Sequence, residues 1–400
     1  MSEIQHFSEF IDGATNYWYK NKFDRCNACD MVNVMLTVFD GDISTPGNQS
    51  NKIPRRISVS AKVYDVDRWN QSREELIELL NWVSGDLFEM SFEKNEELFD
   101  AFPLELPSPR KECITLFSGG LDSFAGSYYN FLNNISSDYV GYVNKAEERT
   151  YQKRLQSFYR KIFSAGGSEV DIRNKYQKPK IFYFQSTRSL LYLSLAISKA
   201  ISNSVKEIRM YENGILSLNP EFGRYTTKTT HPKTIFLYNK LLDTLGYDIR
   251  IVNKFEYETK GEIVENMNLE FKSQIKNTFT CGKSRVGKEY NHTGQCGACI
   301  PCILRKISLA AYDNEHFDAK YFVGYKNVAS ASEKYLKDYI NNIGYFDAYV
   351  EAIKNEEIFG EISNNQHKFH KENNYLRYQK VMFDKFASEY ERFIAKYGIH

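Results

Sequence analysis

The first third of the chain contains two stretches in which aliphatic side chains recur with the period of a strand. In residues 31–39, and again in residues 57–63, aliphatic side chains stand at every second position. A period of two is that of a strand with one buried face, because successive side chains of a strand point to opposite sides. We therefore predict two strands here, paired in an antiparallel sheet.

A helix and a further strand are predicted to follow. Ser72 and Glu75 have the spacing of a capping box, apolar residues recur behind them at helical intervals, and Gly85 marks a helix end. Residues 87–92 predict a short strand. Prolines at positions 103, 107 and 109 then indicate a linker, since proline continues neither a helix nor a central strand. We expect residues 1–110 to form an N-terminal α+β accessory domain.

From Cys113 to about residue 268, short apolar runs alternate with longer stretches of helical periodicity. This order predicts an α/β domain with a parallel sheet and helices on both faces, in which ligands bind at the carboxyl ends of the strands. We expect this catalytic domain to span residues 111–310. Its predicted strands are residues 113–117, 138–143, 180–185, 207–211 and 248–253, and its predicted helices are residues 123–133, 147–163, 188–202, 231–245 and 260–268.

Residues 311–400 predict a helical C-terminal extension rich in aromatic side chains. Its last helix carries an apolar stripe at intervals of three and four residues, which is the pattern of a helix with one buried face. Two interpretations are open: the stripe packs on the catalytic domain, or it docks a partner protein. The stripe comprises Gln379, Met382, Phe383, Phe386, Tyr390, Phe393, Ile394 and Tyr397.

The charge balance narrows the classes of partner. The 400 residues include 52 Lys and Arg against 51 Asp and Glu, a formal net charge of +1, so no overall basic field favours nucleic acid. The longest apolar stretch, around residues 190–197, is too short to cross a bilayer, and the N-terminus does not resemble a signal peptide. We expect a cytoplasmic protein without a membrane partner.

Residues 118–123 read Ser-Gly-Gly-Leu-Asp-Ser, directly between the predicted strand 113–117 and a predicted helix. Adjacent glycines let backbone amides approach a phosphate, the hydroxyls of Ser118 and Ser123 add donors, and a helix N-terminus attracts the anion. The alternative is a surface turn in which Asp122 merely caps the helix. The buried strand in front of the loop favours a pyrophosphate-binding loop.

The cysteines point to a metal site. The chain has seven, an odd number, and four of them cluster, which favours metal ligation in a reducing compartment over disulfides. Four thiolates spaced C-x14-C-x2-C-x2-C can enclose a tetrahedral Zn²⁺ whose closed coordination makes it structural. An iron–sulfur cluster and buried, unligated thiols are the alternatives. The predicted ligands are Cys281, Cys296, Cys299 and Cys302, whereas the pair Cys26 and Cys29 is interpreted as structural.

The loop and the cysteines together make residues 113–310 resemble a known family. The loop is similar to the PP-loop of ATP pyrophosphatases, and the segment resembles the 7-cyano-7-deazaguanine synthase (QueC) family. The resemblance implies an adenine nucleotide alpha hydrolase-like fold whose loop holds the β and γ phosphates of ATP. The matching segments are Ser118 to Ser123, Glu212-Asn213-Gly214, Thr259-Lys260-Gly261-Glu262-Ile263, and Cys296, Cys299 and Cys302 with Arg305.

The resemblance also implies a reaction. A substrate oxygen would attack the α phosphorus of ATP, which is bound with Mg²⁺, releasing pyrophosphate and leaving an adenylate. In the QueC family the substrate is 7-carboxy-7-deazaguanine, whose acyl adenylate reacts with ammonia to an amide and, with a second ATP, to a nitrile. Adenylation suits a carboxylate, because its oxygen becomes a good leaving group only as part of AMP. The chain would then be an ATP-dependent C–N ligase.

Candidate residues of the nucleotide site follow from the loop and from the strand ends. Lys260 and Arg188 could neutralise charge on the phosphates and the carboxylate, with ordinary solvated charges as the alternative. The topology would place adenosine near Phe117 and Val143. The expected catalytic residues are Ser118, Asp122, Lys260 and Arg188. The expected ATP-binding residues are Phe117, Ser118, Gly119, Gly120, Leu121, Asp122, Ser123 and Val143.

Candidate substrate-binding residues lie after the fourth predicted strand. Glu212 could accept hydrogen bonds from the N–H groups of a guanine edge. Arg224, Thr229 and His231 occupy the stretch where α/β enzymes usually shape a substrate pocket, although His231-Pro232 could equally be only a helix start.

The chain also departs from the QueC family. Residues 1–110 and 311–400 have no counterpart there, and the family's substrate-reading segment is replaced by residues 224–232. The enlarged form resembles the QueC-like proteins of bacterial antiphage operons, including QatC of Qat systems and the type IV CBASS protein. That resemblance suggests a deazaguanine that is amidated or joined to an amine on a partner protein. The two extensions could contact an operon partner or a second copy in a homodimer.

Two competing functions stay open. PP-loop enzymes with cysteine clusters also modify tRNA, but thiolation needs a catalytic cysteine and a basic surface. A catalytically silent ATP-binding scaffold of a defence complex is the second alternative, and the intact loop of residues 118–123 argues against decay.

Overall fold

The computed structural model shows an α/β protein built around parallel strands. It describes residues 20–47, 53–96, 111–142, 146–162, 168–170, 185–218, 228–282, 294–326, 328, 331–359, 369–370 and 373–398.

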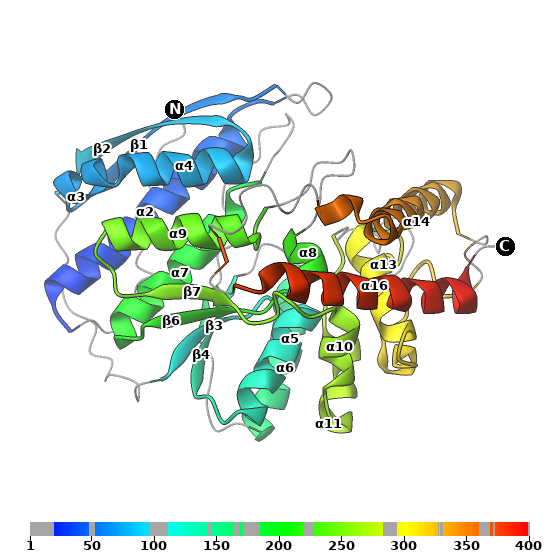
Figure 1. Cartoon of the computed structure of the whole chain (residues 1–400). Coiled ribbons are helices and arrows are strands. Elements are labelled where there is room, and N and C mark those ends of the chain that lie inside the picture. Colours follow the sequence, from blue (N-terminus) through cyan, green and yellow to red (C-terminus); the bar gives the residue numbers. More distant parts are fainter. Residues whose placement is uncertain are drawn as a thin grey trace.

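In the described part of the chain, five parallel strands form the central sheet in the order β5-β4-β3-β6-β7 (Figure 1). Their bounds are β3 Cys113–Leu116, β4 Ser137–Tyr142, β5 Ser168–Val170, β6 Glu207–Met210 and β7 Arg250–Asn253. The helices that follow them are α5 Leu121–Leu132, α6 Ala146–Ile162, α7 Arg188–Asn203, α8 Gly214–Leu218, α9 Pro232–Thr244, α10 Lys260–Glu265 and α11 Leu269–Lys272, followed by the 3-10 turn η2 Ile275–Asn277.

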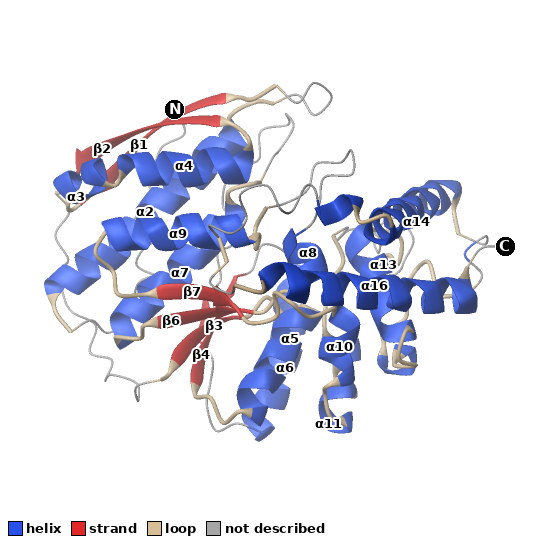
Figure 2. Ribbon diagram, in the orientation of Figure 1, coloured by secondary structure: helices blue, strands red, loops and turns tan. Residues whose placement is uncertain are grey.

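Helices cover both faces of this sheet, as the alternating sequence pattern predicts (Figure 2). α7 and α9 pack on one face, and α5 and α6 lie on the other. In a parallel sheet the carboxyl ends of the strands meet the N-termini of the following helices at one edge. The N-termini of α5, α7 and α10 therefore lie at the carboxyl edge of the sheet.

The N-terminal region adds two further layers beyond α7 and α9. Its elements are α2 Lys22–Ser44, β1 Arg56–Val63, α3 Val66–Gln71, α4 Arg73–Ser84 and β2 Leu87–Lys94. α2 and α4 pack on α7 and α9, and the separate sheet of β1 and β2 covers α2 and α4 from outside (Figure 1). One hydrophobic core runs through these layers into the central sheet, so residues on both sides of position 110 share it.

The predicted strand 31–39 is wrong, because this stretch lies inside α2. Its polar positions do not face water: Asn33 donates to the carbonyl of Lys62 at 2.5 Å, and the hydroxyl of Thr37 donates to the carbonyl of Asn33 at 2.9 Å. α2 lies between β1 and α7 and is buried on nearly all sides. The alternating pattern therefore does not mark a strand with one solvated face, because the helix is enclosed by its neighbours.

The strand pairing and the capping box of this region also need correction. β1 is a strand as predicted, but its partner is β2, and the pair is parallel, with Arg56 opposite Leu87. Ser72 is the N-cap of α4 without any capping bond from its side chain. Ser72 also ends α3, and its φ of −96° and ψ of 9° are not the extended conformation that a capping side chain needs.

Two further differences concern the central sheet. The predicted strand 180–185 falls on residues that, but for Gln185, lie outside the described part of the chain. The strand seen beside β4 is β5, Ser168–Val170, which carries no clear signal in the sequence. The other predicted strands and helices of this region are confirmed to within a few residues.

The C-terminal region is helical, with α13 Ile300–Ala310, η3 Glu315–Phe317, α14 Glu333–Lys354 and α16 Tyr375–Tyr397. α16 runs past the carboxyl edge of the sheet beside α8 and α10 and then along α13 and α14 (Figure 1). Its apolar stripe is buried in a second core that also contains the four clustered cysteines. This confirms the interpretation that the stripe packs within the chain, on residues that precede position 311 as well as on α14.

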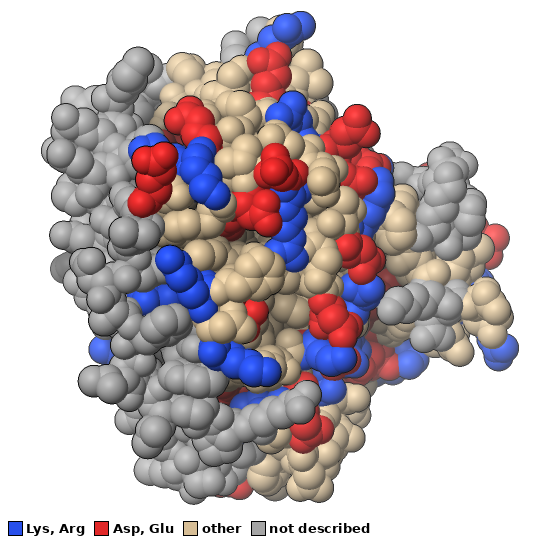
Figure 3. Space-filling view, turned by 90° about the vertical axis from the view of Figure 1, so that its left-hand side faces the viewer, with Lys and Arg blue, Asp and Glu red and all other residues tan. Residues whose placement is uncertain are grey.

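The surface carries mixed charge. On the face seen in Figure 3, lysine and arginine side chains alternate with aspartate and glutamate over the described residues, which agrees with the formal net charge of +1. Among the helices described, none is long and apolar enough to span a membrane.

Candidate functional site

The loop of residues 118–123 connects β3 to α5 at the carboxyl edge of the sheet. Gly119 has a φ of 80°, a left-handed conformation that disfavours side chains, and a Cβ there would lie 2.9 Å from Cγ of Gln152. Gly120 is the N-cap of α5 in an extended conformation and provides no capping side chain. The first amides of α5 therefore remain available for an anion.

Two hydroxyls accompany these amides. The Oγ atoms of Ser118 and Ser123 lie 3.1 Å apart, and Ser118 Oγ also accepts from the N–H of Gly120 at 3.2 Å. Ser118 is exposed, whereas Asp122 and Ser123 are buried. The hydroxyl of Ser123 donates to the carbonyl of Gly120 at 3.1 Å, so the Ser118 hydroxyl is the exposed one of the pair.

Contacts from two other segments fix the loop from behind. Gln152 of α6 donates to the carbonyl of Ser118 at 3.1 Å, and the N–H of Phe279 donates to the carbonyl of Gly119 at 2.9 Å. These two hydrogen bonds restrain the backbone of the loop.

Asp122 lies at the centre of a buried group of polar side chains. Its Oδ1 is 2.7 Å from Nζ of Lys260, and its Oδ2 accepts from Nδ2 of Asn213 at 2.8 Å. Asn213 also donates to Oε1 of Glu212 at 3.1 Å. Asn213 and Lys260 lie 91 and 138 residues after Asp122 in the sequence, and both contact it at the start of α5.

The two carboxyl groups of this cluster have opposite pKa shifts. Burial opposes ionisation of Asp122, but the Lys260 ammonium outweighs it and holds the pKa of Asp122 below its usual range. Burial and the neighbouring Asp122 charge raise the pKa of Glu212 well above its usual range. Asp122 is therefore the more acidic member of the pair, and Glu212 holds its proton to higher pH than an ordinary glutamate.

Arg188 begins α7 at the same edge of the sheet. Its guanidinium donates to Oε1 of Gln185 at 3.3 Å, and no acidic partner is found for it within the described residues. The preceding residue, Thr187, is the N-cap of α7, and its N–H and hydroxyl donate to Oδ2 of Asp42 at 3.0 Å and 2.9 Å. Asp42 belongs to α2, so the N-terminal region fixes the residue next to Arg188.

The structure places the remaining candidates differently. Phe117 and Leu121 are buried in an aromatic cluster, where Phe117 packs against Tyr139 and Tyr159 with ring centroids 5.9 Å and 5.4 Å away. Both side chains are enclosed by this cluster, so only their backbone groups could contact ATP. Val143 and Arg224 lie outside the described residues.

His231 and Thr229 lie at the start of α9. His231 is the N-cap of α9, and its Nδ1 accepts from the N–H of Lys233 at 3.1 Å, so the residue does begin a helix. Burial and the nearby Lys228, His370 and Lys233 lower the pKa of His231 to about 3, which keeps it neutral. Thr229 is half-buried in the preceding turn.

Sequence reasoning missed several residues that shape this site. Asn213 lies in a segment that matches the family motif, and its amide joins Asp122 to Glu212. Asn253, the last residue of β7, is bonded in both directions to the backbone of Glu212, at 3.0 Å and 2.8 Å. A polar residue at the end of a predicted strand was the available signal for Asn253. Gln152 carries no comparable signal.

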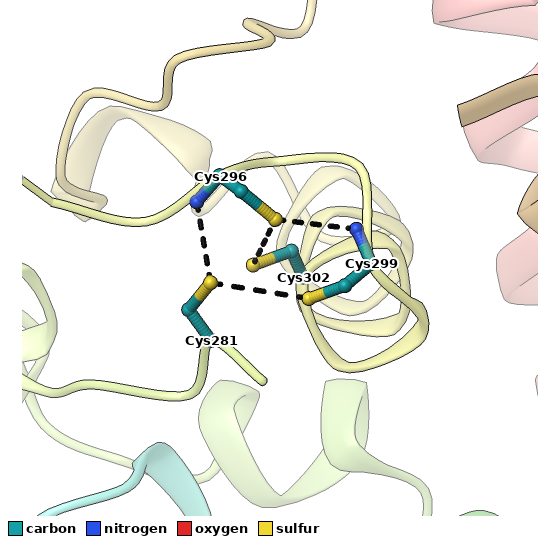
Figure 4. Close-up of side chains that lie close together, drawn as sticks. All are labelled: Cys281, Cys296, Cys299 and Cys302. Carbon is teal, nitrogen blue, oxygen red and sulfur yellow. Dashed lines mark hydrogen bonds between the residues drawn. The ribbon is translucent and has the colours of Figure 1, made fainter. Parts of the chain in front are cut away.

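The four clustered cysteines meet in space. Their sulfur atoms all lie within 4.8 Å of one another and point to a common centre (Figure 4). The Sγ atoms of Cys281 and Cys299 are 4.0 Å apart, and those of Cys296 and Cys302 are 3.9 Å apart. Four thiolates around one metal at about 2.3 Å require sulfur separations of about 3.8 Å. This group could hold a metal ion such as zinc.

The turn that carries two of these cysteines is held by a buried lysine. Nζ of Lys306 donates to the carbonyls of Gly297, Val323 and Gly324 at 2.8, 2.6 and 2.9 Å. Gly297 has a φ of 75°, and a Cβ there would collide with the backbone of Val323. The ligand turn is therefore fixed by packing as well as by the thiolates.

A scan of protein-family models finds no match for this chain, and a search of curated proteins also finds none. The resemblance of residues 113–310 to the QueC family therefore rests on the motifs alone.

Proposed function

We propose that this chain is an ATP pyrophosphatase of the PP-loop type that activates a carboxylate as its adenylate. The observation that carries the proposal is the loop between β3 and α5, where uncapped amides and two hydroxyls lie next in sequence to a buried Asp122, which pairs with Lys260 at 2.7 Å. Amides at a helix N-terminus favour phosphate oxygens. A cation beside them stabilises the charge that develops during phosphoryl or adenylyl transfer.

Each residue of the site has a defined task in this reaction. The loop amides with Ser118 and Ser123 bind the β and γ phosphates, while Lys260 and Arg188 neutralise the pentacovalent centre and the departing pyrophosphate. Mg²⁺ accompanies ATP. The substrate carboxylate attacks the α phosphorus, pyrophosphate leaves, and an amine then displaces AMP to form an amide.

The substrate class comes from the resemblance to the QueC family, which points to a 7-carboxy-7-deazaguanine-like acid. Glu212 supports it, because a partly buried carboxyl at a strand end can accept the N–H groups of a guanine edge. Those donors favour the carboxylate form, so binding would lower the raised pKa of Glu212 and release a proton. The start of α9, with Thr229 and His231, would complete the pocket.

We further propose that the cysteine cluster holds Zn²⁺ as a closed structural site. Its task would be mechanical. Cys281 lies two residues after Phe279, whose N–H fixes the carbonyl of Gly119. A metal at the cluster therefore anchors one of the two contacts behind the phosphate-binding loop.

The setting of the reaction is part of the same proposal. By resemblance to the QueC-like proteins of antiphage operons, the chain would act in the bacterial cytoplasm, alone or as a homodimer. The amine acceptor would then be ammonia or an amino group on a partner protein.

Mass spectrometry of a defined reaction tests this function. Purified protein, Mg²⁺-ATP, 7-carboxy-7-deazaguanine and ammonium are combined, and AMP and the base are followed for the wild type, Asp122→Ala, and the surface control Asp248→Asn. We expect AMP with an amide or nitrile from the wild type and the control, and none from Asp122→Ala. AMP without a free product would identify a protein amine as the acceptor.

Three results would count against this function. AMP that forms only when tRNA is added would favour a tRNA-modifying enzyme. ATP binding without turnover under any condition would favour a scaffold. Equal AMP from Asp122→Ala would show that the activity does not come from this site.

A further inference from the structure

The helix that carries Lys260 begins at an unusually well-fixed cap. Thr259 is the N-cap of α10, and its hydroxyl accepts from the N–H of Glu262 at 3.1 Å. The N–H of Thr259 in turn donates to the carboxylate oxygen Oε2 of Glu262 at 3.1 Å. The hydroxyl proton of Thr259 is donated to Oε1 of Glu389. Glu389 lies on α16, so the C-terminal helix bonds directly to the residue before Lys260.

The next residue, Gly261, brings the two helices into close contact. A Cβ at Gly261 would come closer than 3.0 Å to the Glu389 carboxyl and would lie 2.7 Å from Cε2 of Tyr312. Glu389 is 1% exposed and cannot swing into solvent. Only glycine therefore allows α10 to approach α16 at this point.

α16 makes a second close contact at the other side of the site. A Cβ at Gly214, the residue after Asn213, would collide with Sδ of Met382 and with the carbonyl of Glu256. The N–H of Gly214 also donates to the carbonyl of Glu258 at 3.0 Å. The two residues that bond to Asp122, Asn213 and Lys260, are thus each followed by a glycine that is packed against α16.

We propose that α16 is a positioning element of the nucleotide site, and that Glu389 is the positioning residue that holds Thr259 and Lys260 against Asp122. A lysine at the first position of a helix is opposed by the helix dipole, so its place depends on the Asp122 carboxylate and on a firm cap. Glu389 supplies that firmness without touching a ligand. The catalytic meaning of this contact rests on the proposed function, whereas the contact itself can be tested without it.

The first readout is chemical and independent of activity. Acylation of lysine amines, followed by peptide mass spectrometry, measures the accessibility of Lys260, which is 2% exposed in its side chain, against the surface reference Lys206, which is 67% exposed. We expect Lys260 in Glu389→Ala and in Gly261→Ala to be labelled about tenfold faster than in the wild type, because the pair with Asp122 opens more often. Glu389→Gln keeps the acceptor oxygen and should stay close to the wild type.

Matched controls come from the same region. Glu391→Gln changes an exposed glutamate on α16 that pairs with Lys354, and Gly344→Ala adds a Cβ that meets no atom within 4 Å. Neither should change the labelling of Lys260. Both substitutions exchange a helical glycine for alanine, which favours the helix, so they share the same effect on helix propensity. Faster labelling in Gly261→Ala but not in Gly344→Ala would therefore come from the steric contact at Gly261.

The second readout is the ATP-dependent formation of AMP. We expect kcat to fall about tenfold or more in Glu389→Ala and Gly261→Ala with a smaller change in KM, and Glu389→Gln to restore it. Unchanged labelling of Lys260 in both folded variants would overturn the positioning role. If the wild type makes no AMP, the proposed function fails, and the labelling alone decides whether α16 positions Lys260.

Discussion

In the N-terminal region Asp42 of α2 accepts hydrogen bonds from the N–H and the hydroxyl of Thr187, whereas in the C-terminal region Glu389 of α16 accepts one from the hydroxyl of Thr259. Both threonines are helix N-caps, and each is followed by a basic candidate of the site, Arg188 or Lys260. Two regions that are far apart in sequence thus meet the carboxyl edge of the sheet with the same kind of contact. In both regions an acidic side chain of an outer helix accepts from the N-cap and so holds the start of the next helix.

The two acidic side chains differ in whether a cation lies beside them. Asp42 is 2.6 Å from the Arg55 guanidinium, which also lies 2.5 Å from Asp86. Glu389 forms no ion pair among the described residues, and burial raises its pKa to about 8. The N-terminal contact therefore belongs to a buried ion network, and the C-terminal contact is a carboxyl group poised to change its charge.

The largest expected difference between the two regions is their dependence on metal. The cysteine cluster shares a core with α13, α14 and α16, whereas α2 and β1 belong to the other core. Structural metal sites contribute on the order of 10 kcal/mol in small metal-dependent domains. We expect Cys302→Ser to remove hydrogen-exchange protection from α13, α14 and α16 while α2 and β1 stay protected.

The matched control is Cys26→Ser, which changes a thiol outside the cluster. Equal loss of protection in both regions would show that the two cores unfold as one unit. Full protection of the C-terminal helices in Cys302→Ser would show that a metal at the cluster does not contribute to their stability.

Breaking the ion network should have the next largest effect. Arg55→Met leaves the carboxylates of Asp42 and Asp86 buried without their cation. Removing one partner of such a pair typically lowers the free energy of unfolding by about 3–5 kcal/mol. Urea denaturation measures this change.

Lys206→Met serves as the comparison, because its pair with Asp248 is exposed and should matter little. Equal stability of Arg55→Met and the wild type would mean that the N-terminal carboxylates gain nothing from Arg55.

Much of this architecture could be predicted from local sequence signals. β3, the loop 118–123 and α5 follow one another within 20 residues, and the cysteine spacing encodes a site whose ligands lie close in the chain. The order of strands and helices predicts the parallel sheet, because crossover connections leave few alternatives. These features need no knowledge of contacts between distant segments.

The features that could not be predicted depend on such contacts. The stretch 31–39 is helical because β1 and α7 bury it on opposite sides, which an alternating pattern does not reveal. Glu389 and Asp42 read as ordinary surface acids in the sequence, since neither belongs to a motif. Their role is visible only once α16 and α2 are seen at the N-caps of α10 and α7.

Glu389 is buried and has no ion pair among the described residues, and this predicts a pH dependence of stability. A carboxyl group whose pKa rises from 4.5 to about 8 on folding binds its proton more tightly in the folded state. Its contribution to stability is therefore complete below about pH 4.5 and is lost as pH rises through 8, by up to about 3 kcal/mol between pH 5 and pH 8. Glu389→Gln should remove this slope, and Asp42→Asn should keep it.

Chemical denaturation at a series of pH values tests this. Glu262, Tyr312 and Arg392 also act on Glu389, and Arg392 lowers the pKa of its carboxyl group. The slope in Arg392→Gln should therefore extend to higher pH than in the wild type. An identical pH profile for the wild type and Glu389→Gln would mean that the carboxyl group does not titrate in this range.

The smallest expected effect on stability concerns two glycines, one packed against a side chain and the other against a backbone carbonyl. A Cβ at Gly41 of α2 would lie 2.5 Å from Cγ1 of Val59, a side chain that can shift, whereas a Cβ at Gly214 would collide with the carbonyl of Glu256 as well as with Met382. Overpacking against a fixed backbone costs about 1–3 kcal/mol, while alanine in a helix interior gains up to about 1 kcal/mol over glycine. We expect Gly214→Ala to lower the free energy of unfolding and Gly41→Ala to leave it nearly unchanged, measured by urea denaturation. Met382→Ala in the Gly214→Ala background should recover little, because the collision with the Glu256 carbonyl remains. Full recovery would instead show that the Met382 side chain makes the limiting contact. The contact at Gly214 would then resemble the one at Gly41, where only a side chain has to shift.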